Sequence, residues 1–506
     1  MLFNSFEFLF VFLPIVLFGF FLISRRSATL AAGWLALASV VFYGWWNWRF
    51  VPLLIGSIAV NYVMGITIAR AEGSARTRIF AFAVAADLLA LAYFKYANLL
   101  VTSLNAIVDT HVGALNIVLP LGISFFTFTQ IAYLADVFER KAREPRLVHY
   151  ALFVSYFPHL IAGPILHHHE MMPQFAAART YRPQPNRILV GTVMFVLGLA
   201  KKVLIADNLA PYANAVFAAP DHPSLLVAWG GVLAYALQIY FDFSGYSDMA
   251  IGLSLLFGIR LPLNFNSPYK ATSIIDFWRR WHMTLSRFLR DYLYVPLGGN
   301  RKGETRRYVN LMTTMVLGGL WHGAGWNFAI WGALHGLYLT INHLWRRLFG
   351  HLGPQACGGR IASVALTFLA VNVAWVFFRA PDVATGRQLL SGMFGLHGVS
   401  LPAGLVAFEP LRRALEWIGV DAFLGGGRQF VMTYLWVLFA GAIAFFTPNS
   451  QQIARRFSPA LASASVERVY ALRLRFDWRW ATGLGLLAGL SLLSLSSPTE
   501  FLYFQF

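Results

Sequence analysis

Long apolar runs separated by short basic segments dominate the chain. Four of them fill the first hundred residues, at 8–24, 28–45, 50–69 and 79–101. Each has about the 20 residues that cross a bilayer as a helix. Arg25 and Arg26 follow the first run, and a basic loop follows the third, which predicts an external N-terminus because Lys and Arg collect on the cytoplasmic side. Lys95, near the outer end of the fourth run, is expected to extend its amine to the interface.

Later apolar runs predict further spans at residues 187–206, 225–240, 361–378, 434–446 and 480–495. Residues 118–136 differ, because Pro120 and Gly122 precede a helix studded with polar residues. That pattern predicts a broken or re-entrant element that lines a cavity, since lipid does not tolerate exposed irregular backbone. Residues 402–427 predict an excursion along the interface.

Residues 273–291 combine an aromatic stripe with a dense basic surface. The stripe has helical spacing: Phe277, Trp281, Phe288 and Tyr292. This pattern predicts one amphipathic helix at the cytoplasmic interface. Arg279 and Arg280 are candidate contacts to a polyphosphate, such as the nucleotide end of coenzyme A. The alternative is a basic loop that touches anionic lipid.

The segment 310–346 carries no charge before Arg346 and has length to spare for a tilt or a break within a span. His322 lies in its middle and should face the bundle interior or a wet cavity, because a histidine is costly in hydrocarbon. Gly319 and Gly323 are spaced to let another helix backbone approach closely. A packed, hydrogen-bonded structural histidine is the alternative interpretation.

The composition, 58% hydrophobic and 12% charged, predicts an all-α polytopic membrane protein. The net charge of +18 resides mainly between apolar spans, so it indicates topology and contact with membrane lipids, not nucleic-acid binding. A single cysteine excludes a disulfide framework. Without a repeat or a separable soluble part, residues 1–506 form one expected domain, with peripheral helices (1–112), a catalytic core (113–346) and C-terminal helices (347–506).

Five ordered motifs resemble the membrane-bound O-acyltransferase family, most closely its bacterial alginate O-acetyltransferase branch, which also covers cellulose and peptidoglycan acetylation. They are FPHLIAGPI (157–165), FDFSGYSDMAIG (241–252), LPLNFNSPY (261–269), DFWRRWHMTLSRFLRDYLYVPLGGNRKG (276–303) and GGLWHGAGWNFAIWG (318–332). The resemblance implies a ring of transmembrane helices around a central tunnel, with re-entrant and interfacial helices. It also implies a multi-pass protein of the bacterial inner membrane.

The same resemblance implies the reaction. Acetyl-CoA would be the cytoplasmic donor substrate, with no cofactor or metal. The acetyl group would pass to an exported polysaccharide, directly or through a periplasmic acetyltransferase partner. His322, in the WHG motif, is the expected catalytic residue, and His282, in the RWHMTLS motif, is the expected second one.

The chemistry of a thioester and a hydroxyl agrees with this assignment. A neutral imidazole can take the hydroxyl proton during attack, which is worth about 10²–10⁴ in rate. Asn310, Trp321 and Trp326 are candidate donors to the oxyanion. The chain has no Gly-x-Ser-x-Gly motif, which favours direct transfer over a covalent acyl-enzyme. His335 should not share the face of His322 on one straight helix, and we interpret it as structural.

Two further polar groups leave alternatives open. Asp242 and Asp248 predict either a functional cavity, with Asp242 as a substrate contact, or, with His322, the ion path of a transporter or flippase. The absence of inverted repeats weighs against the transporter. His167, His168, His169 and Glu170 resemble a metal cluster, but consecutive histidines do not easily converge on one ion, so a polar interfacial loop is favoured.

Overall fold

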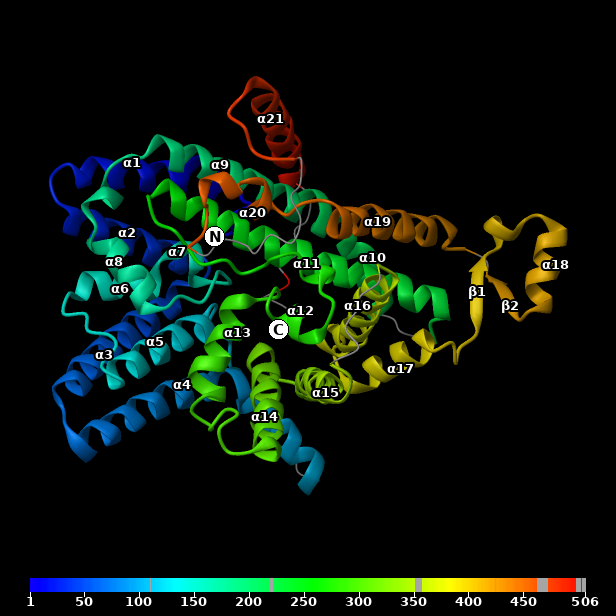
Figure 1. The fold of residues 1–506 in the computed structure, drawn as a ribbon, viewed down its shortest axis with the longest axis horizontal. Coiled ribbons are helices and arrows are strands. Elements are labelled where there is room, and N and C mark those ends of the chain that lie inside the picture. The colour runs from blue at the N-terminus through cyan, green and yellow to red at the C-terminus, as the bar shows by residue number, and fades with distance from the viewer. Residues whose placement is uncertain are drawn as a thin grey trace.

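The computed structural model describes residues 1–109, 111–218, 222–350, 357–423, 425–461, 472–496 and 502. Within these residues, six helical segments are long and apolar enough to span a membrane, and three shorter apolar helices accompany them. The protein is therefore a multi-pass, almost entirely helical membrane protein (Figure 1). The ring and central tunnel implied by the resemblance stay predictions. The C-terminal FLYFQF sequence lies, apart from Leu502, outside the described residues.

The N-terminal helices match the four predicted spans. Their elements are η1 (Phe8–Phe12), α1 (Leu13–Ser24), α2 (Ala28–Gly44), η2 (Trp48–Phe50), α3 (Val51–Arg70) and α4 (Gly73–Val108). The first two spans pack closely because Gly19 leaves room for the ring of Trp34, whose Nε1 donates to the carbonyl of Val16 at 3.0 Å. Helix α4 has 36 residues, so it extends beyond the predicted run at both ends.

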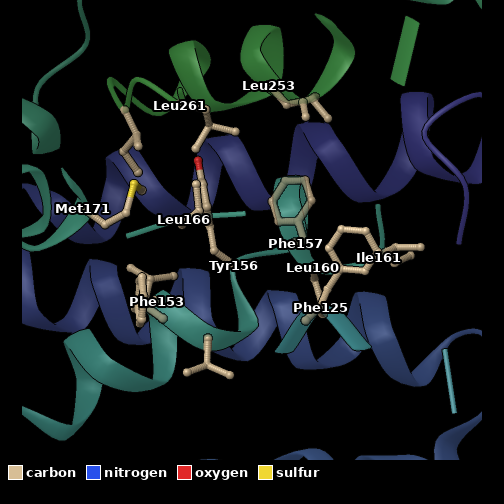
Figure 2. Close-up of a cluster of buried hydrophobic side chains, with 14 of the residues drawn as sticks. Phe125, Phe153, Tyr156, Phe157, Leu160, Ile161, Leu166, Met171, Leu253 and Leu261 are labelled. Atoms are coloured by element: carbon tan, nitrogen blue, oxygen red, sulfur yellow. The ribbon is translucent and has the colours of Figure 1, made fainter. Parts of the chain in front are cut away.

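A buried layer of short helices follows. It contains α5 (Ile123–Phe138), α6 (Leu147–Ser155), α7 (Phe157–Leu160), α8 (His168–Ala176) and η3 (Ala178–Tyr181). Most of α5 is buried, which confirms that it is not a lipid-facing span. Gly122, at φ +70°, precedes α5 and lets its backbone approach the carbonyl of Leu160. Figure 2 shows how Phe125 of α5 and Phe153 of α6 pack in one hydrophobic cluster with Tyr156 and Phe157.

Two long helical segments run side by side through the middle of the protein (Figure 1). One comprises α9 (Pro185–Ala200), η4 (Lys201–Ala206) and α10 (Asp207–Ala218), and the other is α11 (Leu225–Leu256). Gly198 and Gly245 face each other, and a Cβ on Gly245 would lie 2.7 Å from the Gly198 carbonyl oxygen. The two backbones therefore meet because both positions lack side chains. Helix α11 is one continuous helix that carries both predicted aspartates.

Residues 273–291 do not form the single amphipathic helix that the sequence predicts. The structure has η5 (Pro268–Lys270), α12 (Ile274–Trp278), α13 (Met283–Leu289) and η6 (Arg290–Tyr294). The helix breaks at His282, whose φ of 41° is left-handed. The aromatic stripe is buried in protein, with Phe277 only 1% and Trp281 only 3% exposed. The break also divides the predicted face, because Phe277 and Trp281 pack in one core cluster whereas Phe288 and Tyr292 pack in another. Spacing alone could not show that the backbone reverses its local handedness.

The segment 310–346 breaks between α14 (Glu304–His322) and α15 (Trp326–Phe349). Gly319 and Gly332 let these two helices pack against each other, since a Cβ on either would overlap the opposite backbone. The sequence allowed for this break, and it occurs immediately after His322. The chain reverses there, so the end of α14 lies in the protein interior. Its last carbonyls have no hydrogen-bond partner within the helix itself.

The first helices of the C-terminal part pack against α15, whereas its last helices pack against the long central pair (Figure 1). Its elements are α16 (Cys357–Arg379), α17 (Val383–Met393), β1 (Val399–Pro402), η7 (Ala403–Val406), α18 (Glu409–Trp417), β2 (Val420–Phe423), α19 (Gly427–Phe446), α20 (Ser450–Ile453), η8 (Arg455–Phe457), α21 (Trp478–Leu493) and η9 (Ser494–Ser496). The predicted excursion at 402–427 contains η7, α18 and β2. Strand β2 pairs in parallel with β1, and Val399 lies opposite Val420. The sequence did not predict these strands.

Candidate active site

His322 is the last residue of α14 and is only 6% exposed. Gly323 follows it, and a Cβ there would overlap the ring of Phe328. The close turn into α15 therefore needs glycine at this position. The result is an imidazole at the end of a helix, directed into protein rather than lipid, as the cost of a lipid-facing histidine requires.

His282 faces His322 from the break between α12 and α13. The two ring centroids are 6.3 Å apart, although the residues are 40 positions apart in the chain. Aromatic rings enclose His322 on its other sides, with centroid distances of 5.2 Å to Trp331 and 5.0 Å to Phe378. The structure thus brings the two predicted histidines together in an apolar surrounding.

Asn264 orients the imidazole of His282. The Oδ1 atom of Asn264 accepts from the backbone N–H of Thr284 at 3.3 Å, which identifies it as the oxygen, and it lies 3.2 Å from Nδ1 of His282. Nδ1 must therefore carry the proton, and Nε2 keeps its lone pair. Burial lowers the pKa of His282 to about 3, so this ring is neutral at physiological pH.

Lys95 lies beneath the end of α14 and does not reach the outer interface, so the expectation of an interfacial amine is wrong. Its side chain is 7% exposed, and Nζ donates to the carbonyl oxygens of Trp321 and, at 3.1 Å, of His322. The hydroxyl of Tyr96 donates to the next carbonyl, that of Leu320, at 2.8 Å. These two residues of α4 supply donors to carbonyls that have no partner inside the helix.

Comparison with known proteins identifies the family. Residues 137–378 match the family model described as MBOAT, membrane-bound O-acyltransferase family. The chain is 40% identical to a peptidoglycan O-acetyltransferase of Helicobacter pylori, over 100% of this chain and 98% of the relative. It is 41% identical to a probable alginate O-acetylase of Azotobacter vinelandii, with both chains covered completely. This chain belongs to the membrane-bound O-acyltransferase family.

A more distant relative of this O-acyltransferase is a teichoic acid D-alanyltransferase of Bacillus subtilis. The two are 27% identical, over 52% of this chain and 69% of the relative. The matched family region contains both His282 and His322. The protein is therefore an acyltransferase, and this identification decides against the transporter alternative.

The three predicted oxyanion donors of this O-acyltransferase lie in different places. Trp321 is buried beside His322, with 4.8 Å between ring centroids. Trp326 is 60% exposed, and its Nε1 donates to the Ser103 hydroxyl at 3.2 Å. Asn310 lies twelve residues before His322, about 18 Å along α14, and donates to the carbonyl of Gly299 at 3.0 Å. The structure brings only Trp321 next to the histidine pair.

The predicted substrate contacts also differ from one another. Arg279 is exposed, whereas Arg280 is buried and pairs with Asp276 at 2.8 Å. Asp242 is 1% exposed and pairs with Lys202 of η4 at 2.6 Å. Asp276 and Lys202 thus give two of the three predicted residues a structural partner, and their contacts to substrate stay predictions.

Sequence reasoning assigned no role to Asn264 and misplaced Lys95. The position of Asn264 inside the LPLNFNSPY motif could have suggested a functional role. Nothing in the sequence indicated that its side chain reaches His282. The sequence argument about His335 assumed that it shares one straight helix with His322, but the structure places His335 on the separate helix α15. His335 is fully buried behind Trp331, at 4.8 Å between centroids, and Nδ1 accepts from Trp278 at 3.3 Å. These contacts agree with a structural role.

Proposed function

We propose that this O-acyltransferase is an O-acetyltransferase of the bacterial inner membrane that uses acetyl-CoA from the cytoplasm. The acetyl group passes across the membrane for O-acetylation of an exported polysaccharide, directly or through a periplasmic acetyltransferase partner. The substrate class is supported by the two full-length relatives, whose names specify peptidoglycan and alginate. Cellulose, suggested by the sequence motifs, is a third candidate acceptor.

One observation carries the catalytic part of this proposal: His322 and His282 face each other, 6.3 Å apart, in an enclosed aromatic surrounding. His322 acts as the general base. Its neutral imidazole takes the proton from the acceptor hydroxyl while the oxygen attacks the thioester carbonyl carbon. When the carbon–sulfur bond breaks, the thiolate receives that proton, so the imidazole is neutral again and the acetyl ester is complete.

His282 has the complementary position. Its Nδ1–H is committed to Asn264, so the Nε2 lone pair remains to accept a hydrogen bond from the acceptor or from protonated His322. Burial keeps the surroundings poor in water, which strengthens such polar interactions and protects the thioester from hydrolysis. The indole N–H of Trp321 is the best-placed candidate to donate to the oxyanion, because its ring adjoins both imidazoles.

Arg279 is the candidate contact to the phosphates of the donor, since its side chain is exposed immediately after α12 and close to His282 in the chain. Arg280 instead supports the position of α12 through its ion pair with Asp276. A flexible, exposed guanidinium can bind phosphate oxygens with two parallel hydrogen bonds. The donor would then approach His282 before it reaches His322.

Complementation tests the proposed function. We would express the chain in strains that lack the O-acetyltransferase for alginate, for cellulose or for peptidoglycan, and measure ester-linked acetate on each polymer. We expect the wild-type chain to restore acetate on one of them and the inserted His322→Ala variant to restore none. A wild-type chain that inserts normally but restores acetate on none of the three would refute the proposed substrate class.

A further inference from the structure

The three consecutive histidines form the start of α8 and point in different directions. His167 is the N-cap residue with extended dihedrals, and His168 and His169 are the first two residues of the helix, where successive side chains lie about 100° apart around the axis. The rings of His167 and His169 lie together, 5.6 Å apart, whereas His168 packs against Tyr133 at 5.3 Å. The sequence argument against convergence of adjacent histidines therefore does not apply to the first and third of the run.

Asp136, near the end of α5, completes a three-residue cluster. One carboxylate oxygen of Asp136 and one ring nitrogen each of His167 and His169 lie within 4.8 Å of one another. Tetrahedral zinc, with bonds of about 2.0–2.2 Å, needs ligand atoms about 3.5 Å apart. Side-chain movements of about 1 Å would thus let all three atoms reach one ion.

Tyr292 of η6 fixes the proton positions in this cluster. Its hydroxyl donates to Oδ1 of Asp136 at 2.9 Å, so the contact of 3.2 Å to Nδ1 of His167 has the imidazole as donor. Nε2 of His167 is then unprotonated, and it is buried without a hydrogen-bond partner among the described residues. His167 itself is only 3% exposed. One nitrogen held by a neighbour and the other free as a lone pair is typical of metal-bound histidines.

The neighbouring charges are compatible with a bound cation. Arg287 makes a two-pronged ion pair with Glu170, at 2.6 Å and 2.8 Å, which neutralises the arginine beside the cluster. This pair also commits Glu170, the acidic residue of the sequence cluster, to another partner. His169 is exposed, so an ion can enter from solvent.

We propose that Asp136, His167 and His169 bind one divalent transition-metal ion of the zinc class, with water in the fourth position. Two imidazoles and a carboxylate suit zinc or cobalt better than magnesium or calcium. The ion would join α5 to the first turn of α8, and Tyr292 would add a contact from η6. From Tyr292 a series of ring contacts leads through Phe288 and Phe128 to Trp321, so the ion would stabilise one wall of the active site.

Metal analysis of the full-length protein tests this proposal. The protein would carry an affinity tag without histidine, be stripped with EDTA and then be dialysed against zinc. We expect about one zinc per chain by mass spectrometry, a higher Tm than the stripped protein, and visible absorption typical of tetrahedral cobalt when cobalt replaces zinc. His167→Ala and the exposed-site variant His169→Gln should lose the metal and the Tm increase.

His168→Ala is the matched control, because His168 belongs to the same run but faces Tyr133. It should keep the metal stoichiometry of the wild type. Zinc in the reloaded wild type no higher than in the stripped protein would overturn the proposal. Zinc content that is unchanged in His169→Gln would also overturn it and leave an adventitious ion only. Because the readouts are metal content, absorption and Tm, this test does not depend on the acceptor of the acetyl group.

Discussion

Two buried polar regions of this O-acyltransferase differ in their polar groups: one holds charged side chains in ion pairs, and the other holds two imidazoles among aromatic rings. Between η4 and α11, Lys202 pairs with Asp242 at 2.6 Å and with Asp207 at 2.8 Å. Around His322, the groups in ring contact are aromatic side chains and a second imidazole. A buried charge held by its counter-charge is committed to the fold. A neutral imidazole retains a lone pair for proton transfer, so the second region is the one suited to chemistry.

The largest stability effect should come from breaking the charged region. Lys202→Met removes the cation shared by two buried aspartates, and removing one partner of a buried ion pair costs about 3–5 kcal/mol. Thermal unfolding of the purified protein should show a strongly lowered Tm. The exposed Lys302→Met is the matched control and should change stability by about 0.5 kcal/mol or less. Equal Tm values for both variants would contradict the structural role of the Lys202 pairs.

A substitution of Lys95 should lower the rate of acetyl transfer more than it lowers the stability of the fold. It therefore tests the difference between the region around Lys202 and the region around His322. Lys95→Met removes the donors to the carbonyls of Trp321 and His322 and so releases the end of α14. A misplacement of about 1 Å costs up to about 10²-fold in rate, so we expect acetyl transfer to fall by about 10–100-fold. Steady-state transfer rates at saturating donor would measure this.

Tyr96→Phe is the comparison variant for Lys95. It removes one hydrogen bond, to Leu320, one residue further from the histidine. Its rate should lie between those of the wild type and Lys95→Met. A wild-type rate in Lys95→Met would show that the lysine does not position His322.

The contrast between the two regions also explains what could be predicted from the sequence. Apolar run length predicted most of the long apolar helices, although α21, at the last predicted span, has only 16 residues and is not among the six long segments. The length of the segment 310–346 allowed a break but did not place it. In the sequence, Asp242 and His322 are both polar residues within apolar runs and cannot be told apart by role. The distance from Asp242 to Lys202 in the structure identifies Asp242 as part of an ion pair. Lys95 was misplaced for the same reason: its partners lie more than 220 positions away in the chain.

Backbone conformation was the second limit on prediction. The spacing of Phe277 and Trp281 correctly indicated a shared face, but His282 adopts left-handed dihedrals that no periodicity reveals. This local reversal directs its imidazole toward His322 instead of continuing the helix. The motif resemblance named both histidines, whereas their juxtaposition and the role of Asn264 required three-dimensional contacts.

The smallest expected effect concerns the donor surface. Arg279→Glu reverses an exposed charge, and exposed charge interactions are worth about 0.2–1 kcal/mol, so the KM for acetyl-CoA should rise by a few-fold, about 2–5-fold. That KM should also become less sensitive to salt, because one screened attraction is lost. The exposed Arg428→Glu, in α19, should leave the KM unchanged. Identical KM values for both variants would assign Arg279 to topology alone.

The central claim is that His322 takes the acceptor proton in an otherwise folded site. The most direct test is single-turnover acetyl transfer by purified His322→Ala, compared with the wild type after both proteins have been shown to have the same Tm. The account predicts a rate lower by about 10²–10⁴-fold, the usual worth of a general base. A folded His322→Ala variant that transfers acetyl at the wild-type rate would contradict it.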